Sequence, residues 1–251
     1  MKKTKQILTT ITFLAHLTIL AQCIERKKIS FGSEYGFVDY IHLCPTYNFS
    51  YDGDKSTDWN VLTDPIDIKQ APKEVLIFKE QIENEIRNYS GDNLFSKLVF
   101  KSVEVVYEDK LKIFTEKGRQ NLTLGFCKAK YFYYYELELD TISTYLVGVA
   151  LDKKGKRLSK YRFPNKSNYV PIDTNYDYCK LIEIAKKSQP FIEPIEDIKL
   201  DFDEKIKRFY WQITQEIVNK KEGRNYFNQV IIDASDFTKT KNLTGNVNVV
   251  Y

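Results

Sequence analysis

Residues 131–140 read YFYYYELELD, and residues 145–159, which follow after four more residues, read YLVGVALDKKGKRLS. In the first segment the odd-numbered positions from Tyr133 to Leu139 are apolar or aromatic, while the even-numbered positions become acidic. This period of two predicts a strand with one buried face and one wet face. The second segment is apolar at nearly every position as far as Leu151. It predicts a strand that is buried on both faces and central in its sheet, so we expect the rest of the chain to cover these two strands.

The segment that precedes these strands, residues 72–89, has the pattern of an amphipathic helix. Its sequence is PKEVLIFKEQIENEIRNY, and its apolar residues recur at spacings of three and four. Pro72 suits a first helical turn, Glu74 lies near the positive end of the helix dipole, and Gly91 follows as a stop. The stripe expected to face the sheet consists of Val75, Phe78, Ile82, Ile86 and Tyr89.

A second pattern of a helix followed by strands occupies the last third of the chain. Residues 176–189, YDYCKLIEIAKKSQ, repeat the helical spacing, and Asp173, Thr174 and Asn175 are the expected cap residues ahead of them. Pro190 prevents the helix from continuing. Alternation in the remaining sequence predicts strands over residues 198–202, 208–217 and 226–233, and a final edge strand at 247–250.

Both halves therefore have the same order of elements, and each closes on an apolar run that ends in an aspartate. The two runs are VGVALDKKGKRLS and QVIIDASDFTKTK, in which Asp152 and Asp233 are the matching residues. We expect an α+β fold with two related units, each one helix packed on an antiparallel sheet, produced by a divergent internal duplication. The expected organisation is a signal peptide at 1–21, a loop-rich N-terminal preface at 22–71, a first α+β unit at 72–164 and a second at 165–251.

The helix, the strands such as FYWQI, and the last strands VALDKKGK and QVIIDA together resemble the PepSY and cystatin-like α+β modules of exported bacterial proteins. In such modules the last strand commonly passes from apolar alternation into Asp and a Gly turn. The resemblance extends over residues 72–160 and 173–240, although the second copy has Ser235 and Asp236 in place of the Gly turn. It implies helix-on-sheet modules in an exported protein. The cystatin inhibitory pattern Gln-x-Val-x-Gly is absent, so peptidase inhibition does not follow from it.

The chain begins with the layout of a secretory signal peptide. Three lysines in the first five residues are followed by an apolar run over residues 7–20 and then by Ala21, Gln22 and Cys23. The run is shorter than the roughly 20 apolar residues that a membrane span needs. We expect cleavage after Ala21 and export to a periplasmic, cell-surface or secreted location. The segment also resembles a bacterial lipobox, with Gln22 departing from its pattern, and a lipid anchor at Cys23 is the one membrane attachment that we expect.

The charge balance argues against a nucleic-acid partner. The formal net charge is +4, but without the three signal lysines the chain carries 35 basic and 34 acidic residues. Such a neutral chain has no basic footprint for phosphates. The basic residues around Gly155 predict a solvated hairpin turn.

The four cysteines permit two disulfides in an oxidising compartment, in any of three pairings. If Cys23 is lipidated or lost, one of the remaining three is free. The alternative is that Cys127 and Cys179 are buried small hydrophobic residues. The disulfide candidates are Cys44, Cys127 and Cys179, with Cys23 as the fourth cysteine.

Motifs for nucleophilic, zinc or nucleotide chemistry are missing from the sequence. His42 is the one histidine outside the signal segment, and a structural role suits its aromatic surroundings better than catalysis. We expect no catalytic residue, no metal site and no cofactor. The enzymatic alternative is a carboxylate-based hydrolase that uses Glu136, Glu138 and Asp140, which share one strand face. A plain solvent-facing surface explains these carboxylates more simply.

The aromatic run offers a better candidate site. Five successive aromatic residues cannot all enter one core from one strand, so Phe132 and Tyr134 face the helix, a second layer or solvent. If exposed, they form a binding surface, because aromatic rings offer large contact area at low entropy cost. We therefore expect a non-enzymatic binding or accessory module of the bacterial cell envelope, with an unidentified protein or glycan partner. An inhibitor or immunity-like protein is the remaining alternative.

Overall fold

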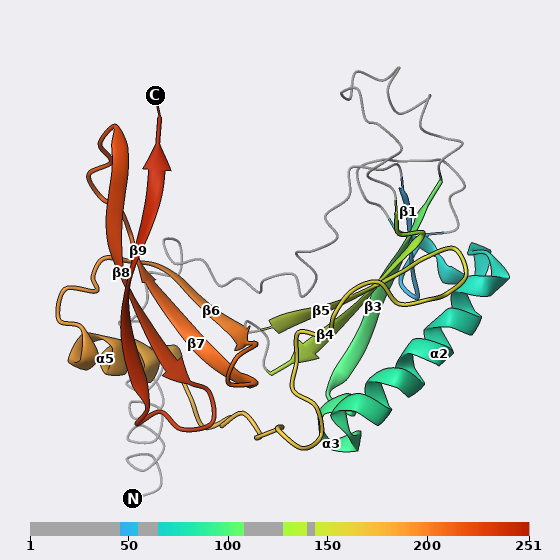
Figure 1. Ribbon diagram of the computed structural model, residues 1–251, viewed down its shortest axis with the longest axis horizontal. Helices are drawn as coiled ribbons and strands as arrows, with labels where there is room; N and C mark the ends of the chain where they lie inside the picture. The colour runs from blue at the N-terminus through green and yellow to red at the C-terminus, as the bar shows by residue number, and fades with distance from the viewer. Residues whose placement is uncertain (1–45, 55–64, 108–127, 140–143, 251) are drawn as a thin grey trace, which may run out of the picture. The chain divides into compact units, whose positions relative to one another are not determined.

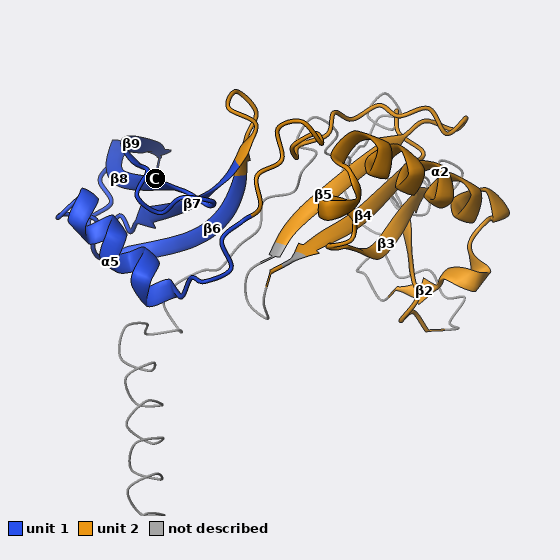
Figure 2. Cartoon of the chain, turned by 90° about the horizontal axis from the view of Figure 1, so that it is seen from below, with its two compact units in different colours: residues 1–32, 172–201, 209–251 blue, residues 33–171, 202–208 orange. Residues whose placement is uncertain are grey.

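The computed structural model describes residues 46–54, 65–107, 128–139 and 144–250. The chain divides into two units (Figure 2). The N-terminal unit takes in the described residues up to Pro171 together with residues 202–208, and the C-terminal unit takes in residues 172–201 and those from Phe209 onward. Helices and strands occur in both, so the α+β class is correct.

The N-terminal unit contains a five-stranded sheet in the order β2-β1-β3-β4-β5. All neighbouring strands in it are antiparallel except β1 and β2, which run parallel. The expectation of a purely antiparallel sheet is therefore wrong for this unit. The two added strands lie in the loop-rich preface, whose short aromatic runs are compatible with one or two short strands. The strands are β1 (Thr46–Ser50), β2 (Ile66–Asp67), β3 (Leu98–Val106), β4 (Tyr131–Glu138) and β5 (Thr144–Leu151).

The predicted first helix is confirmed as α2 (Lys73–Ser90), which Gly91 ends with a φ of +79°. It covers one face of the sheet (Figure 1). The Tyr133 hydroxyl donates a 2.7 Å hydrogen bond to the Val75 carbonyl of α2, and the Phe78 ring meets the Tyr131 ring edge-on at 5.3 Å. Two shorter helices, the 3-10 helix η2 (Ile68–Gln70) and α3 (Asp92–Phe95), flank α2, so this unit holds more than one helix.

The strand β5 lies at the end of the sheet order, and the expectation that it is central is wrong. Its two faces are both apolar because each is covered. The chain beyond the strand folds back along its outer edge: the Leu158 amide donates to the Ala150 carbonyl (2.8 Å), and the Ala150 amide donates to Ser159 Oγ (3.0 Å). A covered edge strand has the same apolar sequence pattern as a central strand, which explains the error.

The C-terminal unit contains one helix, α5 (Tyr178–Ser188), and a four-stranded sheet in the order β6-β7-β8-β9. Trp211 lies at the centre of the core with 1% of its surface exposed, and its ring is 6.4 Å from that of Tyr178 on the helix. The strands are β6 (Ile195–Asp203), β7 (Arg208–Gln215), β8 (Gly223–Asp233) and β9 (Thr240–Val249).

Two details of this unit differ from the sequence prediction. The N-cap of α5 is Asp177, whose Oδ1 accepts from the Lys180 amide at 2.7 Å, and the helix starts later than residues 173–175 suggest. The last strand starts at Thr240 and spans ten residues, where the sequence indicates an edge strand only at 247–250. Asn and Gly weaken the strand signal of β9, but the pairing with β8 stabilises it.

Candidate binding surface

Strand β8 is paired on both sides for only part of its length. It pairs with β7 from Gln229 to Asp233, but with β9 from Gly223 to Ile232. Residues 223–228 and their partners 244–249 therefore form a two-stranded ribbon beyond the rest of the sheet, which we name the β-arm. In Figure 1 the paired ends of β8 and β9 run on past β6 and β7 toward the C-terminus. Two strands without a further partner are only marginally stable in water.

The outer edge of β9 presents backbone groups that pair with no other described strand. The Ala234 amide donates to the Phe209 carbonyl, and the Asp233 amide donates to the Lys239 carbonyl. Because antiparallel ladders alternate, even-numbered residues of β8 bond to β7 and odd-numbered ones to β9. In β9 the odd-numbered residues consequently bond to β8, and the even-numbered residues point their N–H and C=O groups outward. These outward-facing residues are Thr240, Asn242, Thr244, Asn246 and Asn248.

Strand β9 lacks the features that usually protect a sheet edge. It is the last strand in its sheet, and no other described strand pairs with its outer side. Its ten pairs with β8 follow one register without a bulge. It contains no proline, and Lys241 is its one charged residue. Edge strands that do not bind a partner usually carry charges, prolines or bulges, so this edge is well suited to accept another strand.

The two faces of the β-arm have different chemistry. One face carries Tyr226, 64% exposed, among Asn, Thr and Arg side chains of both strands. The other carries apolar residues: Val247 is 40% exposed, and Leu243, one residue before the β-arm, is 37% exposed. On that face the Phe227 ring lies over Gly245, where an added Cβ atom would be only 2.4 Å from the ring. The aromatic ring thus shields a glycine in the edge strand.

A set of amide side chains anchors the base of the β-arm. Gln215 Oε1 accepts from the Asn228 backbone amide (2.9 Å) and from Asn228 Nδ2 (3.0 Å). Gln215 Nε2 donates to the Phe191 carbonyl at 2.6 Å. On the helix side, Ser188 Oγ donates to Asn242 Oδ1 at 2.7 Å. These bonds fix the arm at its base and hold Phe191 beside it with 77% of its surface exposed.

The aromatic residues expected to bind a partner are not an exposed patch. Phe132 is 1% exposed and packs with Val106, Ala129 and Ala150 on the sheet face opposite α2. Tyr134 is half-buried against the same cluster. The large exposed rings beside the candidate surface are Tyr226 and Phe191. The sequence signal for the surface is the alternation of amide and apolar residues in β9.

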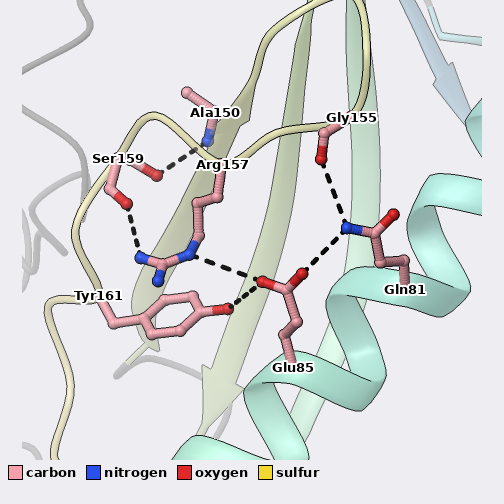
Figure 3. Close-up of polar contacts among 7 residues, drawn as sticks. All are labelled: Gln81, Glu85, Ala150, Gly155, Arg157, Ser159 and Tyr161. Atoms are coloured by element: carbon pink, nitrogen blue, oxygen red, sulfur yellow. Dashed lines mark hydrogen bonds and ion pairs between the residues drawn. The ribbon is translucent and has the colours of Figure 1, made fainter.

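The N-terminal unit contains a connected polar cluster on α2 (Figure 3). The Glu85 carboxylate accepts from Gln81 Nε2 (3.0 Å) and the Tyr161 hydroxyl (3.4 Å), and it pairs with Arg157 Nε at 3.7 Å. Gln81 Nε2 also contacts the Gly155 carbonyl at 3.4 Å. Burial raises the pKa of the Tyr161 hydroxyl, which keeps it a donor. Every charged group here is engaged, so the cluster fastens the turn after β5 to the helix.

The hairpin turn expected around Gly155 is confirmed, because Leu151 and Arg157 bridge antiparallel across it and its basic residues are exposed. Gly155 is buried against α2 and has a φ of +80°. Arg157 Nη1 donates to the Ser159 carbonyl at 2.8 Å, and its guanidinium stacks on the Tyr161 ring at 4.0 Å. The turn is therefore solvated at its basic side chains and also attached to α2 through Gly155 and Arg157.

The remaining candidate residues have little described chemistry. Glu136 forms a 2.6 Å ion pair with Lys101, while the side chain of Glu138 and all of Asp140 lie outside the described residues. Cys179 is disulfide-bonded, and its partner lies outside the described residues. The signal segment, His42, Cys23, Cys44 and Cys127 also lie outside them.

Within the described ranges, His, Cys, Asp and Glu residues form no group of three or more that could hold a metal ion. No described helix combines the length and apolar character needed to cross a membrane. No protein-family model, curated protein or solved structure matches this chain.

Proposed function

We propose that this protein is an exported, non-enzymatic binding module of the cell envelope, and that its β-arm accepts a strand of a protein partner. One observation carries the proposal: β9 offers an outer edge of ten residues without bulge, proline or dense charge. In strand addition, backbone hydrogen bonds supply affinity, and alternate side chains supply specificity. The anchored base of the β-arm keeps this edge in place before binding, which lowers the entropy cost of association.

Two features support export. The first 23 residues have the layout of a signal peptide, with a possible lipidation site at Cys23. Cys179 is disulfide-bonded, and disulfides persist in oxidising compartments such as the periplasm and the extracellular space. The protein acts there as an accessory that holds a partner, with no cofactor of its own.

We infer also that the two units descend from one duplicated module of the PepSY and cystatin-like kind. In each unit a helix precedes three successive neighbouring strands, α2 before β3-β4-β5 and α5 before β6-β7-β8. In each, the third strand leads into a turn headed by an aspartate, Asp152 or Asp233, whose Oδ1 accepts backbone amides of the turn. The extra strands and helices of the N-terminal unit are additions to this common plan.

Site-specific photo-crosslinking in cells that export the chain tests the binding role. A photoreactive residue replaces Asn246 on the β-arm or, as a matched control, Ile77, which is 62% exposed on α2. We expect a covalent protein adduct from position 246 and none from position 77. Adding Thr244→Pro should abolish the adduct, because it removes an outward N–H while leaving the pairing with β8 in place. Equal adducts at both positions, or none at position 246, would contradict the proposal.

A further inference from the structure

We propose that the strand accepted by the β-arm is β9 of a second copy of this chain, paired antiparallel across a twofold axis. The inference rests on the proposed function of the β-arm as a strand-pairing surface, and it identifies the partner. In this pairing the two C-terminal sheets join edge to edge into one sheet. Three properties of β9 support a second copy as the partner: its backbone, its side-chain alternation and its charge.

The backbone of β9 is compatible with its own copy in antiparallel orientation. Its outward N–H and C=O groups belong to the even-numbered residues, as derived above from the ladder with β8. A twofold axis perpendicular to the sheet keeps equivalent faces on the same side, and it therefore pairs even-numbered residues with even-numbered ones. The groups that face outward are thus the groups that meet, and each donor finds an acceptor.

The side chains of β9 are self-complementary when Gly245 lies on the axis. Leu243 then stands opposite Val247 of the other copy, and Thr244 stands opposite Asn246. Asn242 stands opposite Asn248. On one face Leu243 meets Val247, and on the other face hydrogen-bonding residues meet their like. Such cross-strand pairs stabilise a sheet, and Leu243 and Val247, now exposed, become covered.

The charge of β9 favours the antiparallel orientation. Lys241 is the one charged residue of the strand. In the antiparallel register it stands opposite Val249, at the far end from the other Lys241. In a parallel register the two lysines would lie side by side, and like charges directly opposite each other destabilise a strand pair. The same pairing turns the two-stranded β-arm into a four-stranded sheet, which corrects its marginal stability.

Sedimentation equilibrium of the exported chain measures the self-association directly. We expect a monomer–dimer equilibrium for the natural sequence. Asn246→Pro should raise the dimer dissociation constant about tenfold or more, because two interface hydrogen bonds are lost per dimer. Asn246→Ala retains the N–H group and should change the constant by less than about threefold. A natural chain that stays monomeric, or equal constants for the two variants, would overturn the inference.

A second measurement tests the register and does not depend on the folding of a proline variant. Leu243 and Val247 of opposite copies form a pair without direct backbone hydrogen bonds, in which Cα atoms are about 4.5 Å apart. The double variant Leu243→Cys, Val247→Cys should therefore form a covalent dimer under mild oxidation. The control Leu243→Cys, Val249→Cys is out of register and should not.

The crosslinking experiment at position 246 separates failure of this inference from failure of the proposed function. An adduct with the mass of two chains agrees with self-pairing. An adduct with a different protein, lost with Thr244→Pro, overturns self-pairing but leaves the binding role of the β-arm intact. The absence of any adduct overturns both.

Discussion

The two units share one order of elements, a helix and then three strands, but the chain after the third strand differs between them. In the N-terminal unit, the chain after β5 returns along the strand edge, where Leu158 and Ser159 bond to Ala150. In the C-terminal unit, the chain after β8 continues as β9, whose outer side pairs with no other described strand. The edge of β5 is thus covered within its own unit, whereas the edge of β9 is available for binding. The difference shows that the segment after the aspartate turn decides whether a unit is closed or can accept a partner.

The cores of the two units also differ in chemistry. The N-terminal unit packs α2 on a row of tyrosines, and Tyr133 extends its hydroxyl to the backbone of the helix. The C-terminal unit packs aliphatic residues around the Trp211 ring, which the rings of Tyr176 and Tyr178 also contact. The indole nitrogen of Trp211 is buried and has no hydrogen-bond partner among the described residues. The stability of the N-terminal core should therefore depend on the ionisation of its tyrosines, and that of the C-terminal core on the Trp211 side chain.

The largest effect is expected from Trp211→Ala, which should destabilise the C-terminal unit and leave the N-terminal unit folded. Truncation of a buried tryptophan costs about 3–5 kcal/mol, a large part of the usual stability of a domain. Hydrogen exchange should show lost protection in α5 and β6–β9 but retained protection in α2 and β3–β5.

Trp211→Phe is the matched control for that truncation. It keeps a ring in the core and removes the unpaired N–H, so we expect a loss of less than about 2 kcal/mol. If Trp211→Ala removed protection from both units together, they would form one cooperative unit, contrary to the division described here.

Alkaline pH should lower the free energy of unfolding of the N-terminal unit but not that of the C-terminal unit. Burial raises the pKa values of Tyr133 and Tyr135, and neighbouring ionisable groups add to the shift. Above pH 10 the unfolded chain loses phenolic protons that the folded unit retains, so stability falls as pH rises. The loss is about 1.4 kcal/mol per pH unit for each tyrosine, or about 3 kcal/mol for both at pH 11.

Phenolate absorbance and hydrogen exchange between pH 9 and about pH 12 measure this effect. The exchange of α2 and β4 should accelerate first. The double variant Tyr133→Phe, Tyr135→Phe has no such phenols and should lose less stability over the same range. Simultaneous weakening of both units in the natural chain and the variant would show that these tyrosines do not set the alkaline limit.

A smaller difference in stability is expected between alanine variants of two glycines, Gly155 in the turn after β5 and Gly223 at the start of β8. Gly155 and Gly223 both have positive φ angles, +80° and +96°. An alanine at either position costs about 1–2 kcal/mol for the left-handed backbone. At Gly155 the new Cβ would also lie 2.4 Å from the Phe78 ring on α2, whereas at Gly223 it meets nothing within 4 Å.

Gly155→Ala should therefore cost about 1 kcal/mol more than Gly223→Ala, because Phe78 must move. Denaturant unfolding of the two variants gives the difference. Equal losses would mean that the contact between the turn and α2 contributes no packing energy, and the account of this turn as fastened to the helix would fail.

Much of the fold could be predicted from local patterns. The stripe of apolar residues in α2 and the alternation in β4 both indicated the correct elements, because side-chain periodicity follows directly from backbone geometry. The candidate surface was only partly predictable. An edge strand near the C-terminus was expected, but its length was underestimated, since Asn and Gly have weak strand preferences that the partner β8 overrides.

Long-range pairing decided the remaining features. The sequence of β5 indicates two apolar faces, yet only the fold shows that the strand lies at an edge covered by residues 157–159. In the same way Phe132 could have been exposed, and packing against Val106 and Ala150 buries it. A one-dimensional pattern records which faces of a segment are apolar but not which segment covers them. The open edge of β9, on which the proposed binding depends, is for that reason a property of the tertiary structure.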